Sequence, residues 1–122
     1  MNFQGLWTVS FSAAEEAHKG ITVREDIERG GVFVLLDGRV YGGGVSYYFT
    51  GTYTGKGPAL EMQVTAARYN EVVTGIFGDQ PRILLAFSGS VAGEKIVLHG
   101  HVQGSPDKRM DVMAVRRSII EG

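Results

Sequence analysis

The chain contains no cysteine, only 3 prolines among 122 residues, and almost no net charge, at -1. The lack of cysteine excludes disulfide bonds, thiol catalysis and cysteine-ligated zinc. No apolar run approaches the ~20 residues that a membrane-spanning helix needs, so no membrane association is expected. With a pI near 6.3 there is no global basic field to attract nucleic acid or anionic lipid. We therefore expect no direct nucleic-acid binding.

The first residues, Met1 to Trp7, lack the basic and apolar regions of a secretory signal, which leads us to expect a cytoplasmic protein. A composition of 43% apolar and 20% charged residues is ordinary for a globular protein. The length fits one domain over residues 1–122 with a core of its own.

The 18 glycines lie between or inside short apolar runs, as expected for tight turns and strand bends. Residues 3–12 alternate with period two, which predicts a strand with one buried face. Asp37-Gly38, between the apolar runs 31–36 and 39–41, predicts a hairpin with a type I′ turn. Five further strands are expected, at 47–54, 60–66, 83–87, 96–102 and 110–114, with turns that include 104–107. Residues 13–30 are interpreted as an irregular connection.

Short strands separated by short turns, with little helix, indicate an all-β fold. A sandwich is the alternative, but closure removes the unpaired edges of a long meander. We predict a single small antiparallel up-and-down β-barrel of about eight strands, of the calycin or lipocalin type. Such a barrel is filled by side chains or holds one small ligand. The residues expected to line that interior are Trp7, Val9, Val34, Phe49, Met62, Leu85, Phe87 and Leu98.

Gly5-Leu6-Trp7 resembles the G-x-W opening of lipocalin-type barrels, in which the tryptophan plugs one end of the barrel. In those barrels an arginine of the last strand packs over the ring. Arg116 and Arg117 are available for this cation-π contact, so a structural role is expected for Trp7.

His99 and His101 lie two residues apart on an expected strand and therefore share a face. Two imidazoles at this spacing could contribute to a metal site, but two ligands do not complete a tetrahedral zinc centre. We expect both to face solvent, without a bound metal.

Nothing in the sequence argues for catalysis. Ser88 lies in a strand-like segment without a G-x-S-x-G elbow, and the carboxylates are scattered. The glycine clusters neither open a helix nor precede Gly-Lys-Ser/Thr, so no nucleotide site is indicated. We predict a protein that is not an enzyme, with no catalytic residues and no cofactor.

Glu25, Asp26 and Glu28 could form an acidic docking patch for a partner, although mixed charge in a connection is more often a solvated surface.

Several segments of the chain resemble the GrlR family, the negative regulators of type III secretion genes. The matching stretches are Asp37-Gly38-Arg39-Val40-Tyr41-Gly42-Gly43, Tyr47 to Thr54, Arg68-Tyr69-Asn70, and Leu98-His99-Gly100-His101-Val102-Gln103-Gly104 followed by Met110-Asp111-Val112. Gly5-Leu6-Trp7-Thr8-Val9 fits the first strand of the family. The resemblance implies an eight-stranded calycin-like barrel, a homodimer, an apolar cavity, and regulation through binding of a helix-turn-helix activator protein.

Two functions follow as hypotheses. The first is a bacterial regulatory module that pairs with itself and binds a regulatory protein. Its dimer surface would use apolar residues expected on the outer face, namely Leu6, Tyr48, Val97, Met113 and Val115. The second is a carrier or sensor that holds a small apolar ligand inside the barrel.

Overall fold

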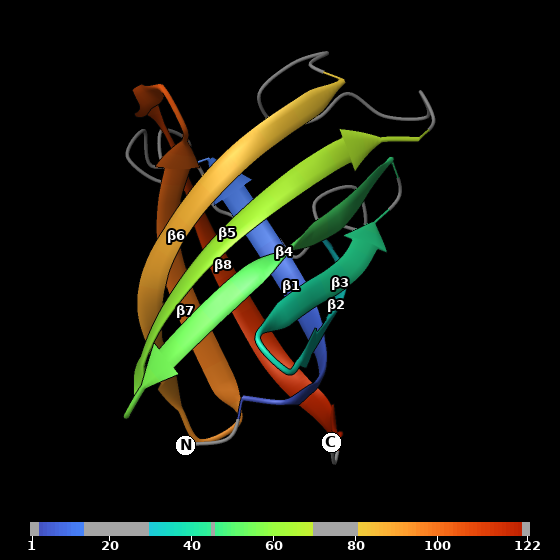
Figure 1. Cartoon of the computed structure of the whole chain (residues 1–122), viewed down its shortest axis with the longest axis vertical. Helices are drawn as coiled ribbons and strands as arrows, with labels where there is room; N and C mark the ends of the chain where they lie inside the picture. The colour runs from blue at the N-terminus through green and yellow to red at the C-terminus, as the bar shows by residue number, and fades with distance from the viewer. Residues whose placement is uncertain (1–2, 14–29, 45, 70–80, 121–122) are drawn as a thin grey trace.

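The chain folds into one closed barrel of eight antiparallel strands, seen in a computed structural model that describes residues 3–13, 30–44, 46–69 and 81–120 (Figure 1). The strands are β1 (Gly5–Ala13), β2 (Gly30–Leu36), β3 (Arg39–Gly44), β4 (Tyr47–Lys56), β5 (Ala59–Arg68), β6 (Arg82–Ala92), β7 (Lys95–Val102) and β8 (Ser105–Ile119). Each strand pairs with the next along the chain, and β8 returns to pair with β1. The prediction of an all-β, up-and-down barrel of about eight strands is confirmed.

The described residues contain strands and turns and no helix. None of these residues belongs to a helix long and apolar enough to cross a bilayer.

The predicted hairpin at Asp37-Gly38 connects β2 and β3, and both turn residues have positive φ, at 51° and 78°. This is the conformation that a type I′ turn requires. The last hairpin differs from the prediction at 104–107. The chain reverses at Gln103-Gly104, and β8 already begins at Ser105. An irregularity in the β7–β8 register after His101 accommodates the additional residues.

Side chains at alternate positions of every strand point inward and form a single core. At the end of the barrel where the N- and C-terminal residues lie, the core is fully closed by Trp7, Leu35, Leu60 and Ile96 (Figure 1). Toward the opposite end the inward-facing residues include half-buried side chains, namely Phe11, Tyr47, Phe49 and Val102. Phe11 and Phe49 contact each other edge to face across this end, with ring centroids 6.2 Å apart.

The expectation that Val34 lines the interior is wrong. Trp7 of β1 pairs in register with Phe33 of β2, so Phe33 and Leu35 point inward and are buried. Val34 lies between them and therefore projects to the outer face, where it is half-buried.

Two inward-facing glycines, Gly51 of β4 and Gly89 of β6, mark places where neighbouring strands approach closely. A Cβ atom at Gly51 would collide with the carbonyl oxygen of Gln63, and one at Gly89 with that of Val97. These strands can bend tightly around the core because the side chain is missing.

Candidate functional site

Trp7 closes one end of the barrel and is fully buried. Its indole Nε1 donates a hydrogen bond of 3.0 Å to the carbonyl of Phe3, and its ring stacks on Phe33 with centroids 6.5 Å apart. The guanidinium carbon of Arg116 lies 5.2 Å from the ring centroid, as expected for a cation-π contact. The structural role expected for Trp7 is therefore supported, with Arg116 as the arginine over its ring.

Arg116 is fixed by Glu94 in the β6–β7 turn. Its Nε and one terminal nitrogen donate to the two carboxylate oxygens at 2.7 Å and 3.0 Å, a bidentate pair. These hydrogen bonds, with the attraction between the two charges, lower the pKa of Glu94 and raise that of Arg116, against a smaller effect of burial. The neighbouring Arg117 instead donates to the Thr8 hydroxyl on the outer face, at 2.8 Å. The ion pair with Glu94 thus holds the Arg116 guanidinium in place over the Trp7 ring at the closed end of the barrel.

The residues predicted to line the interior do so, with the exception of Val34. Six are buried in the core, and Phe49 is half-buried against it. The six are Trp7, Val9, Met62, Leu85, Phe87 and Leu98. Glu25, Asp26 and Glu28 lie outside the described residues, so their part in partner binding stays a prediction.

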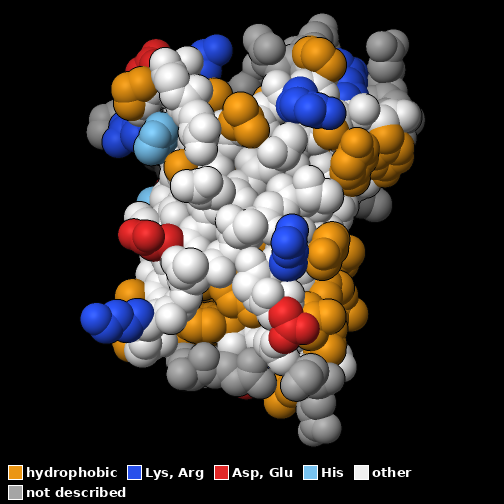
Figure 2. All heavy atoms as spheres, in the orientation of Figure 1, with side chains coloured by type: hydrophobic (Ala, Val, Ile, Leu, Met, Phe, Trp, Pro, Cys, Tyr) orange, Lys and Arg blue, Asp and Glu red, His pale blue; other side chains and the backbone are white. Residues whose placement is uncertain are grey.

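The outer face of β1–β4 carries a cluster that we call the apolar wall: Leu6, Val32, Val34, Tyr41 and Tyr48. Leu6, Val34 and Tyr41 form one row across β1, β2 and β3, because each pairs in register with the next. Val32 and Tyr48 flank Gly43 in the adjacent row. Tyr41 is 51% exposed, Tyr48 44% and Val32 43%. Orange side chains gather on this side of the molecule in Figure 2.

The five outer residues predicted for dimerisation are therefore divided between two places. Leu6 and Tyr48 belong to the apolar wall. Val97 and Met113 are register partners on β7 and β8, and Val115 lies two residues beyond Met113. Val97 and Met113 are exposed, whereas Leu6 and Val115 are half-buried.

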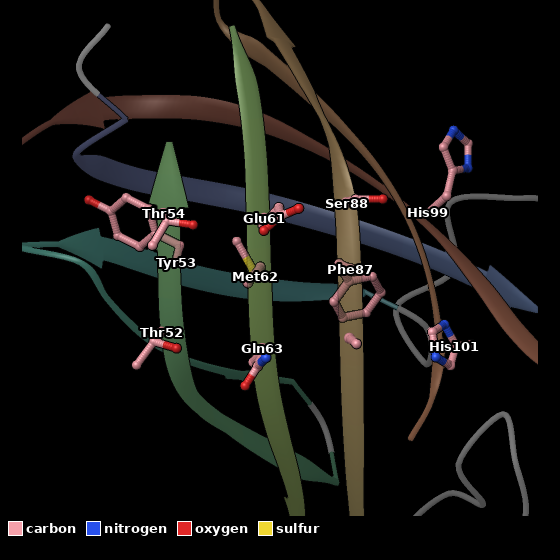
Figure 3. Close-up of a pocket in the computed structure, with 11 residues that line it drawn as sticks. Thr52, Tyr53, Thr54, Glu61, Met62, Gln63, Phe87, Ser88, His99 and His101 are labelled. Carbon is pink, nitrogen blue, oxygen red and sulfur yellow. The ribbon is translucent and has the colours of Figure 1, made fainter. Parts of the chain in front are cut away.

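A polar groove of about 420 Å³ crosses the outer face of β4–β7 (Figure 3). Its outward-facing side chains lie in two rows that follow the strand register. One row consists of Thr54, Glu61, Ser88 and His99, and the other of Thr52, Gln63, Ala86 and His101. In Figure 2 the face over β4–β6 is mostly white, in agreement with these hydroxyl and amide side chains.

His99 and His101 face outward, as predicted, with His99 exposed and His101 half-buried. Nδ1 of the His99 ring forms a hydrogen bond of 2.7 Å with the carboxylate of Asp111, its register partner on β8. The register partner of His101 is Arg109. Over the described parts of the chain, no three histidine or carboxylate side chains converge as a metal site would require.

The adjacency of Ser88, His99 and Asp111 was missed by reasoning from the sequence. Alternation alone places all three on outer faces, but they come from three strands. Only the register of β6 on β7 and of β7 on β8 puts them in one row.

Comparison of the chain with models of known protein families gave no match, and neither did comparison with curated proteins.

Proposed function

We propose that this chain is a regulatory protein-binding module that acts as a homodimer paired through its apolar wall. The observation that carries the proposal is the row Leu6–Val34–Tyr41 with Val32 and Tyr48 beside it. Tyrosines are enriched at protein interfaces, and contiguous exposed apolar patches mark association sites.

A two-fold pairing suits this wall. A self-complementary patch closes the assembly after two copies, which is the commonest arrangement among soluble oligomers. Gly43 lies between Val32 and Tyr48 and has no side chain, so no polar side chain interrupts this row of the wall. Closure of the barrel leaves the eight described strands without a free edge to pair, so among them association would use a sheet face.

Light scattering at micromolar concentration tests the dimer. We expect a mass of two chains for the wild type and of one chain for Tyr41→Asp combined with Tyr48→Asp, because each dimer would bury four carboxylates. Leu84→Asp is the matched control: Leu84 is an equally exposed apolar residue on β6, outside the wall. A single-chain mass for the wild type, or a dimer that survives both tyrosine changes, would refute the pairing.

The regulatory part of the proposal rests on the sequence resemblance to the GrlR family, which acts by binding an activator protein. The partner would be captured away from the wall, at Glu25, Asp26 and Glu28. Replacing these three residues with lysine should weaken capture of the partner in a pull-down from the source organism without changing the mass of the dimer. Undiminished capture would show that the acidic residues are only a solvated surface.

A second candidate function is the carriage of a small apolar ligand. It is favoured by the contrast between the two ends of the interior, one fully buried and the other lined by half-buried Phe11, Tyr47, Phe49 and Val102. Native mass spectrometry of the purified protein tests it. A ligand retained by the wild type and lost in Phe49→Ala would support carriage, whereas a bare mass after incubation with fatty acids would exclude that class of ligand.

A further inference from the structure

The outer face of β7 and β8 carries exposed apolar side chains bordered by two cations, and we call this surface the β7–β8 patch. Its members are Lys95, Val97, Met113, Val115 and Arg117. Val97 and Met113 are register partners, 39% and 49% exposed, so two apolar side chains stand next to each other in solvent. Val115 follows on the same face of β8, beside its register partner Lys95. The patch lies on strands that the apolar wall of β1–β4 does not use.

The two cations of the patch lie on either side of Val115. In the row Lys95–Val115–Thr8 each residue pairs in register with the next, so the Cα atoms of Lys95 and Thr8 lie about 10 Å apart, two strand spacings. Arg117 has no register partner on β1, because the β1–β8 register shifts at this point. Its Nε donates to the Thr8 hydroxyl at 2.8 Å. Positive charge therefore borders Val115 on the β7 side and on the β1 side.

Two neighbouring carboxylates are already engaged elsewhere. Glu94, in the turn before β7, accepts hydrogen bonds from Arg116 on both of its carboxylate oxygens. Asp111, on the outer face of β8, is hydrogen bonded to His99. Neither cation of the patch forms an ion pair with another of the described residues. Within the described part of the chain, the positive charge of the patch is therefore left uncompensated.

We propose that the β7–β8 patch binds an acidic segment of a partner protein, with its carboxylates between the two cations and an apolar side chain on the Val97–Met113 pair. Opposite charges steer and orient such a contact, and burial of the apolar pair adds affinity. Methionine and arginine are both enriched at protein interfaces. A nucleic acid would engage the cations through its phosphates but leave the apolar pair unused, so a peptide fits this surface better.

The probe is a fluorescein-labelled peptide in which Leu-Glu-Glu-Leu is repeated three times, titrated with the purified full chain and followed by fluorescence anisotropy. We expect saturable binding that weakens as salt is raised, because salt screens exposed charges. Lys95→Glu combined with Arg117→Glu should lower the affinity about tenfold or more, since like charges then face each other. Val97→Ser combined with Met113→Ser should lower it by a similar factor at low and high salt, because apolar contact is not screened.

A matched control separates the patch from the charge of the whole molecule. Lys56→Glu combined with Arg82→Glu changes the net charge equally, at exposed cations of β4 and β6, and should keep the wild-type affinity. Equal losses in the two charge-reversed variants would mean attraction by net charge alone and would overturn the proposal. A wild-type chain that does not bind the peptide would overturn it as well. Melting temperatures verify that each variant is folded.

Two other occupants of the patch would give different results, and either result would overturn the proposal. A second copy of the chain would appear in light scattering as a loss of mass in Lys95→Glu/Arg117→Glu. An anionic membrane would appear as cosedimentation with phosphatidylglycerol vesicles, lost in the same variant, without binding of the peptide.

The patch is independent of pairing through the apolar wall. Tyr41→Asp combined with Tyr48→Asp should bind the peptide as the wild type does, whether or not the chain is a dimer. The patch also takes a partner of opposite charge to one that docks at Glu25, Asp26 and Glu28. Failure of this inference is therefore distinguishable from failure of the proposed function.

Discussion

Trp7 depends on polar partners as much as on the apolar core around it. Its indole N–H is satisfied by the Phe3 carbonyl, and its face is covered by Arg116, whose side chain is only 11% exposed. A buried cation of this kind needs a partner, and Glu94 supplies both carboxylate oxygens. One aromatic residue, one cation and one carboxylate thus close the end of the barrel together.

Trp7→Ala should reduce the free energy of unfolding by about 3–5 kcal/mol, the usual cost of removing a large buried aromatic side chain. Urea denaturation followed by circular dichroism measures this change. Leu84→Ala, at an exposed apolar position of β6, should stay within about 0.5 kcal/mol of the wild type. A loss well under 1 kcal/mol in Trp7→Ala would mean that the ring does not plug the barrel.

The Arg116–Glu94 pair predicts a pH dependence of stability. The pKa of Glu94 is lower in the folded protein than its ordinary value of 4.5, because the folded state hydrogen-bonds the ionised form. Its contribution to stability is therefore present above about pH 4.5 and is lost as the pH falls through the lower folded value.

The measurement is the difference in melting temperature between wild type and Glu94→Gln as a function of pH. We expect the wild type to be more stable at pH 7 and the difference to shrink below pH 4.5. Glu61→Gln is the control, since Glu61 has no ion-pair partner among the described residues. A difference that is independent of pH would contradict the assignment.

His99 and His101 should bind zinc weakly at most, because no third metal-binding side chain converges with them among the described residues. Titration with zinc should leave the melting temperature nearly unchanged, as no tight native-state site shifts the folding equilibrium. Stabilisation at one zinc per chain that disappears in His99→Ala/His101→Ala would show that the pair is a metal site.

At the scale of elements, the barrel owes its curvature to positions without side chains. Gly51 and Gly89 face inward where a Cβ atom would meet a backbone carbonyl of the neighbouring strand. A backbone clash cannot be relieved by turning a side chain, so the strands would have to separate.

Gly89→Ala should therefore destabilise the protein by about 1–3 kcal/mol, the typical cost of overpacking. Ser90→Ala, on the outer face one residue further along β6, should stay within about 0.5 kcal/mol. Chemical denaturation of the two variants in parallel decides the matter, and equal stabilities would show that β6 can shift to accept a Cβ atom.

At the scale of the whole molecule, pairing of β1 with β8 closes the sheet, so the eight described strands offer their outer faces for association. If the apolar wall joins two copies, folding and association are linked by mass action. The melting temperature should then rise with protein concentration, and this rise should vanish in Tyr41→Asp combined with Tyr48→Asp. A wild-type melting temperature that does not vary with concentration would argue against the dimer.

The sequence by itself determined the class of fold and most of the core. Strict alternation, as in Ile96, Leu98 and Gly100, defines both the strand and its buried face, because the side-chain period of a strand is two. The turn at Asp37-Gly38 could also be predicted from the sequence, since few residue pairs tolerate two consecutive positive φ angles.

Tertiary structure decided what alternation left open. From Val32 to Leu36 every residue is apolar, so alternation cannot tell which of them point inward. Phe33, and not Val34, points inward because it pairs in register with the inward-facing Trp7. The register likewise decided that Ser88, His99 and Asp111 share one row. A shift of one residue on any strand would have turned its side chain to the other face. Such neighbours are fixed by the packing of the whole barrel, which no local stretch of sequence contains.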